Sequence, residues 1–91
     1  MSTALDDAII QRISFLREAL LVEHKLDNMR TFHAQIRILQ TAQLDRLEEL
    51  IKIRKTDLQN ARNTYDADLI FSELDALEWL QRLAQKRHRR H

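Results

Sequence analysis

The chain has 91 residues, of which 44% are hydrophobic and 32% charged, and its formal net charge is +1. This composition is too apolar for a disordered segment, and the length allows one domain with a modest core. Gly, Pro and Cys are all absent. Tight turns, β-hairpins and phosphate-cradling loops therefore lose support, and disulfides, thiolate nucleophiles and cysteine metal sites are excluded.

The longest uninterrupted apolar run, Ala19 to Val22, is short. A membrane-spanning helix needs about 20 apolar residues, and the apolar region of a signal peptide needs at least about 7. We expect neither of them, and we expect the protein in the cytoplasm or inside a particle assembled there.

The first predicted helix covers residues 3–25, with Ser2 or Thr3 as its cap. Its apolar side chains recur every three or four residues, the spacing that gathers them on one face of a helix. This face is wider than a short bundle can cover, so we expect it to need a partner. The main stripe consists of Leu5, Ile9, Ile13, Leu16 and Leu20, joined by Ala8, Phe15, Ala19, Val22 and Leu26.

The second predicted helix covers residues 29–62. Its length of about 34 residues corresponds to nearly 50 Å, so it overhangs its neighbours and exposes apolar side chains, which usually marks an interface. The apolar spacing slips near Gln40, which favours a short bundle over a long regular coiled coil. The apolar stripe consists of Met29, Phe32, Ile36, Leu39, Leu44, Leu47, Leu50, Ile51, Leu58 and Ala61.

The apolar stripe changes direction near residues 25–28 and near residues 62–66, and we place helix breaks there. Side chains that can cap a following helix are present at both breaks, namely Asp27 and Asn28, then Asn63, Thr64 and Asp66. The competing layout keeps residues 3–62 as one bent helix. The third helix carries apolar residues on two sides, with Tyr65, Leu69, Ala76, Trp79 and Leu83 on the second side.

We therefore predict an all-α fold, either a three-helix bundle or a long helical hairpin, with one extended central helix and coiled-coil-like packing. A single helical domain would cover residues 1–85, and residues 86–91 would form a basic tail. Trp is frequent at the energetic centre of interfaces, so Trp79 and Leu80 are the expected anchors of partner binding. The predicted interface consists of Leu44, Leu47, Ile51, Leu58, Trp79, Leu80 and Leu83.

The tail carries the only dense charge run, which consists of Lys86, Arg87, Arg89 and Arg90. Clustered Lys and Arg displace the counterions of nucleic-acid phosphates, so the tail is suited to nucleic acid or to an acidic protein surface. The alternative is a solvated helix end whose charges complement the helix dipole. The acidic residues from Asp66 to Glu78 are expected to pair with basic surface on the second helix.

Neither a catalytic nor a metal-binding pattern is present. The four histidines lack the Glu three residues earlier that di-iron bundles use, and the pairs His24 with Asp27 and His88 with His91 offer only two ligands each. His33 lies on the apolar stripe, where we expect a hydrogen-bonded interface residue. We expect no enzyme, no cofactor, no metal, no membrane contact and no small-molecule ligand.

Leu5 to Ile9 and Phe71 to Leu74 resemble the start and the end of small phage head-to-tail joining proteins, which also carry basic tails. Their glycine-bearing β-hairpin is absent here, and a long helix stands in its place. The leading hypothesis is a helical adaptor or assembly subunit, a homo-oligomer or part of a larger assembly, that acts through helix packing. The resemblance implies a virion structural component as one alternative, and the tail indicates a nucleic-acid-associated protein as another.

Overall fold

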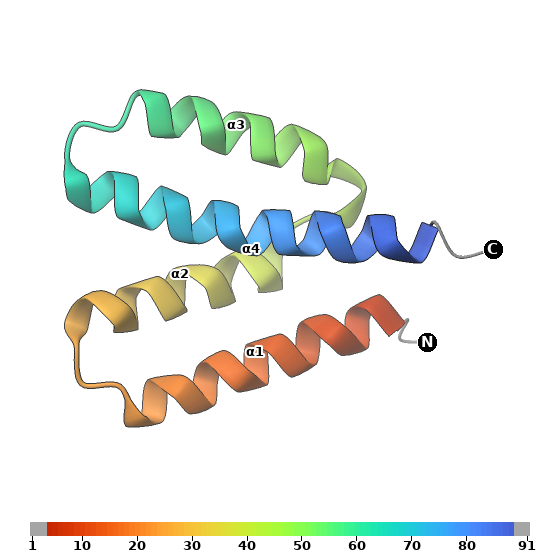
Figure 1. Cartoon of the computed structure of the whole chain (residues 1–91), viewed down its shortest axis with the longest axis horizontal. Coiled ribbons are helices and arrows are strands. Elements are labelled where there is room, and N and C mark those ends of the chain that lie inside the picture. Colours follow the sequence, from red (N-terminus) through yellow and green to blue (C-terminus); the bar gives the residue numbers. More distant parts are fainter. Residues whose placement is uncertain (1–3, 89–91) are drawn as a thin grey trace.

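The computed structural model describes residues 4–88, and their side chains as far as residue 86. This part of the chain contains no strand, and the all-helical prediction is confirmed. Its elements are α1 (Ala4–Val22), α2 (Leu26–Thr41), a short 3₁₀ helix η1 (Leu44–Arg46), α3 (Leu47–Gln59) and α4 (Thr64–His88). Consecutive α-helices run antiparallel (Figure 1).

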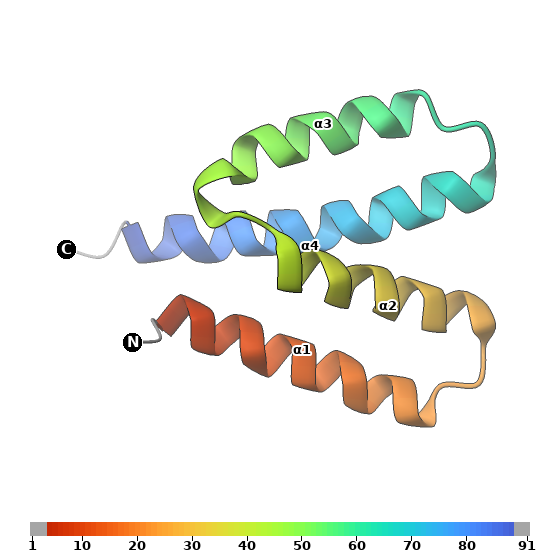
Figure 2. The ribbon, with the colours of Figure 1, turned by 180° about the vertical axis from the view of Figure 1, so that it is seen from behind.

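The helices lie side by side in the order α1, α2, α4, α3 (Figures 1 and 2). The molecule measures 44 × 33 × 18 Å. The middle dimension fits four helices in a row at spacings of about 8–10 Å. The fold is therefore one twisted layer, in which α4 packs between α2 and α3 while α1 packs mainly on α2.

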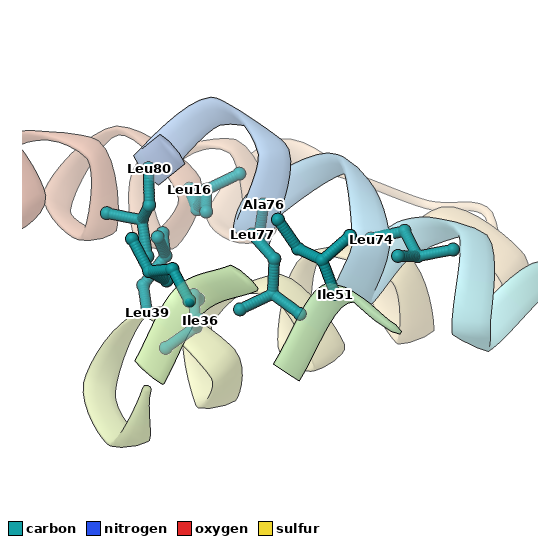
Figure 3. Close-up of a cluster of buried hydrophobic side chains, with 9 residues drawn as sticks. Leu16, Ile36, Leu39, Ile51, Leu74, Ala76, Leu77 and Leu80 are labelled. Carbon is teal, nitrogen blue, oxygen red and sulfur yellow. The ribbon is translucent and has the colours of Figure 1, made fainter. Parts of the chain in front are cut away.

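α4 supplies the centre of the hydrophobic core. Leu77 and Leu80 are 1% and 0% exposed, and Leu16 of α1 is 2% exposed. Leu39 of α2 and Ile51 of α3 belong to the same cluster, so both neighbours bury apolar side chains against α4 (Figure 3). Each Leu or Ile side chain buried in this way contributes about 1.5–3 kcal/mol.

The prediction of one continuous helix over residues 29–62 is wrong, because the chain turns at Ala42 and Gln43 between α2 and α3. Both residues have extended backbone, with ψ of 132° and 116°. Side-chain contacts close the turn, since Arg46 donates from Nη1 to Gln43 Oε1 at 3.2 Å and from Nε to Glu49 Oε2 at 3.1 Å. Folding back lets Leu39 and Ile51 pack against the same helix, which a straight rod would prevent.

The other two helix breaks lie close to their predicted places, at residues 23–25 and 60–63. Asn63 caps α4 as expected, because its Oδ1 accepts the N–H of Asp66 at 2.8 Å. α2 begins without a side-chain cap, and in the turn before it Glu23 Oε1 accepts the N–H groups of His24 and Lys25 at 3.1 and 3.0 Å. The expected cap by Asp27 or Asn28 is wrong, because both lie inside α2, and Ser2 and Thr3 lie outside the described residues.

Arg54 connects α3 to α4. Its Nη2 lies 3.2 Å from Glu73 Oε2, and its Nη1 lies 3.1 Å from Asp57 Oδ2 on its own helix. The expected pairing between the acidic stretch and the basic surface of the preceding segment is thus present at Glu73. α4 also continues to His88, past the domain boundary predicted at residue 85. Within residues 4–88, the length and apolar character that a bilayer crossing requires are not combined in any helix.

The substitution Leu80→Ala should lower the free energy of unfolding by about 2–5 kcal/mol, because it removes buried methyl groups and leaves a cavity. Urea unfolding followed by circular dichroism measures this loss. Leu21→Ala is the matched control, since Leu21 is 85% exposed and its truncation should change stability very little. Equal effects of the two substitutions would contradict the assignment of Leu80 to the core.

The hydrogen bond from the N–H of Lys25 holds the pKa of Glu23 below its ordinary value of 4.5. A carboxyl whose pKa is lowered by folding stabilises the fold above its ordinary pKa, and this contribution disappears as the pH falls through the lowered value. We expect a carboxyl NMR titration of Glu23 with a midpoint below 4.5. A midpoint at or above that value would show that Glu23 does not cap the turn in solution.

Candidate protein interface

Three of the five aromatic side chains of this protein are exposed. Phe15 of α1 is 56% exposed, and Tyr65 and Phe71 of α4 are 47% and 53% exposed. Trp79 is partly buried against the hydrophobic core. Large apolar rings cost free energy when they face water, and several of them on one surface usually mark an interaction site.

Arginine side chains lie over these rings. The guanidinium carbon of Arg12 lies 5.2 Å from the ring centre of Phe15 and 5.8 Å from that of Trp79. Arg30 of α2 lies 4.8 Å from the ring centre of Tyr65. Such cation–π contacts contribute about 0.5–1 kcal/mol each at exposed sites. They hold both arginines in place and join α1 and α2 to α4.

A groove follows the boundary between α2 and α4. Its first part, of about 340 Å³, is lined by Arg30, Tyr65, Phe71 and Asp75 among others. Its second part, of about 260 Å³, is lined by Arg12, Trp79, Arg82 and again Asp75. Asp75 lines both parts, so they lie next to each other. We call this surface the aromatic face, and its rings are those of Phe15, Tyr65, Phe71 and Trp79.

Small residues create the groove. Ser72 and Ala76 of α4 are buried and line the two parts of the groove. The Ser72 hydroxyl is satisfied within α4, since it donates to the carbonyl of Asp68 at 2.9 Å. Gln35 Nε2 donates to the carbonyl of Ser72 at 3.3 Å and ties the two helices together. The floor of the groove is therefore hydrogen-bonded and fixed.

Acidic groups line the groove unevenly. Asp27 lies 3.8 Å from Arg30 and is almost fully exposed, so this ion pair contributes little. Among the described residues, the carboxylates of Asp68 and Asp75 have no ion-pair partner. Both side chains are exposed and accessible to a partner.

Most of the predicted interface lies inside the chain itself. Leu47, Ile51 and Leu80 belong to the buried core, and Leu58, Trp79 and Leu83 are partly buried. Leu44, in η1, is 37% exposed. The three core residues are therefore not surface residues of this fold, because α3 folds back and packs against α4.

The apolar periodicity of the sequence indicates only some of the residues of the aromatic face. Tyr65 and Trp79 belonged to the second apolar side of the third predicted helix, and Phe15 to the broad apolar face of the first. Phe71 had no comparable signal. The juxtaposition itself depends on the order of the helices in the layer, which the pattern of one helix does not contain.

The remaining candidate residues lie apart from this face or outside the described part. Lys86 is exposed near the end of α4, the side chain of Arg87 is not described, and Arg89 and Arg90 lie beyond residue 88. His33 is exposed on α2 and is not part of the core. Residues 4–88 contain no cluster of three or more His, Cys, Asp or Glu side chains that could bind a metal ion.

Comparison of the chain with known protein families, with curated proteins and with solved structures found no match.

The substitution Arg12→Gln should lower the free energy of unfolding by about 0.5–1 kcal/mol, because it removes the cation that lies over Phe15 and Trp79. Trp79 is the only tryptophan, so its fluorescence reports urea unfolding directly. Arg17→Gln serves as the control, since Arg17 is an exposed residue of the same helix without a ring contact. The assignment fails if both variants unfold at the same urea concentration as the parent chain.

Proposed function

We propose that this protein is a non-enzymatic helical assembly subunit that binds other protein chains through the aromatic face. The observation that carries the proposal is the exposure of Phe15, Tyr65 and Phe71 on one face, beside ordered arginines. Aromatic residues and Arg are enriched in protein interfaces, whereas Lys and Glu are depleted there.

The energetics of such a surface favour a protein partner. Full burial of an exposed phenylalanine contributes about 1.5–3 kcal/mol, and Phe15 and Phe71 are about half exposed, so a partner that covers each ring gains roughly half of that. Arg12 and Arg30 are already held against rings in the free chain, so binding costs less side-chain entropy than it would for free arginines. The groove along α2 and α4 adds a concave surface into which partner side chains can pack.

The double substitution Phe15→Ser with Phe71→Ser should weaken association with other chains tenfold or more, since it removes two rings from the face while leaving the core intact. Light scattering coupled to size-exclusion chromatography measures the mass of the parent chain, which should exceed the 10.9 kDa of one copy at high concentration. The variant should elute at a lower mass than the parent at equal concentration.

Leu21→Ser with Ile53→Ser is the matched control. Both residues are large, apolar and exposed, but neither lines the aromatic face. This control should associate as the parent chain does. A parent chain that remains a cooperatively folded monomer at high concentration would refute the proposal, and so would equal weakening by the two double substitutions.

A further inference from the structure

One stripe of α4 faces solvent along the whole helix. Its members are spaced so that they fall within about 60° of arc at about 100° per residue. All of them are exposed, and four of them, Asp68, Phe71, Asp75 and Arg82, also line the groove of the aromatic face. The α4 stripe consists of Thr64, Asp68, Phe71, Asp75, Arg82 and Lys86.

The α4 stripe is acidic in its first half, with Asp68 and Asp75, and basic in its second half, with Arg82 and Lys86. The helix dipole does not account for this order, because its influence is confined to the first and last turns, whereas Asp75 and Arg82 lie in the interior of α4. Within the described residues, neither Asp75 nor Arg82 has an ion-pair partner.

The two charges cannot satisfy each other within one chain. Asp75 and Arg82 are seven residues apart on one straight helix, which separates them by about 10.5 Å along its axis. An ion pair requires the charged atoms to approach within about 4 Å. A molecule that carries the opposite order of charges along its surface would neutralise both halves of the stripe at once.

We infer that this molecule is a second copy of the chain, whose α4 packs antiparallel on the α4 stripe. Turning the helix end for end reverses the order of its charges, so an antiparallel copy presents a basic half to the acidic half and an acidic half to the basic half. A parallel copy would place like charges opposite each other, which is unfavourable. The resulting contact is self-complementary, as a twofold dimer requires.

The charges also define the register of the pair. When Asp75 lies opposite Arg82 of the second copy, Arg82 lies opposite its Asp75, and Phe71 lies opposite its Lys86. The Lys86 ammonium is then placed to form a cation–π contact with the exposed Phe71 ring. The twofold axis passes between positions 78 and 79, so Glu78 and Trp79 of both copies lie beside it.

This inference rests on the proposed function, and it names the partner of the same face. Two single substitutions test it, Asp75→Arg and Arg82→Asp. Each variant alone presents like charges at both pairs of the register and should dimerise at least tenfold more weakly than the parent chain. Both residues are exposed, so circular dichroism should show unchanged helix content in each variant.

The decisive measurement mixes the two variants in equal amounts. In the mixed dimer, Arg at position 75 faces Asp at position 82, and Arg at position 82 faces Asp at position 75, so both pairs are restored. We expect a dimer in sedimentation velocity only in the mixture, together with a change in Trp79 fluorescence. Repair of folding within one chain cannot produce this result, since neither variant carries a compensating change.

A mixture that remains monomeric, or a single variant that dimerises as well as the parent chain, overturns the inference. If association is unaffected by the charge substitutions but is lost in the Phe15→Ser, Phe71→Ser variant, the inference fails while the proposed function stands. If the parent chain stays monomeric, both fail. If the α4 stripe binds nucleic acid instead, the parent chain should bind duplex DNA and Arg82→Asp should lose this binding without a change in oligomeric state. That result also overturns the inference.

Discussion

The packing of α4 against two helices at once is the interaction on which the rest of the structure depends. Leu77 and Leu80 are fully buried because α2 covers one side of α4 and α3 covers the other. With α4 in the middle of the layer, the chain must turn at Ala42 and Gln43, or Leu39 and Ile51 would not both contact it. The ion pair between Arg54 and Glu73 then aligns α3 on α4.

The same packing explains why one face of the layer is suited to binding. A helix in the middle of a single layer keeps a strip open to solvent, and on α4 this strip carries charges and a phenylalanine ring. Ser72 and Ala76 are small, so α2 approaches α4 closely and leaves a groove between the larger residues beside them. Burial of the apolar side of α4 and exposure of its functional side are therefore two consequences of one arrangement.

Sequence patterns predicted the all-helical class, the approximate positions of two helix breaks and three candidate caps for the last helix, of which Asn63 is the one used. They did so because helical periodicity and capping are local properties. The third break was missed, although the apolar spacing slips at Gln40, because Leu44, Leu47 and Ile51 continue the stripe in phase on the far side of the turn. A single sequence does not show whether such a stripe covers one neighbour or folds back on the helix before it.

The candidate site was harder to predict for the same reason. Leu47, Ile51 and Leu80 have the spacing of interface residues, but helix periodicity does not distinguish a partner chain from the chain's own core. Phe15 and Phe71 lie 56 positions apart and share a face only through Arg12, Trp79 and the groove. Only the tertiary arrangement contains this information.

The order of the helices in the layer also has a consequence for how the chain folds. α1 with α2 and α3 with α4 are hairpins of neighbouring segments, so each can form after closing a short loop. The contact between α2 and α4 is the one extensive pairing that spans a whole intervening helix, and it unites the two hairpins. Mostly local pairings of this kind give a low contact order, which is associated with folding in microseconds to milliseconds. The docking of two preformed hairpins along α2 and α4 is then the step that commits the chain to its native topology.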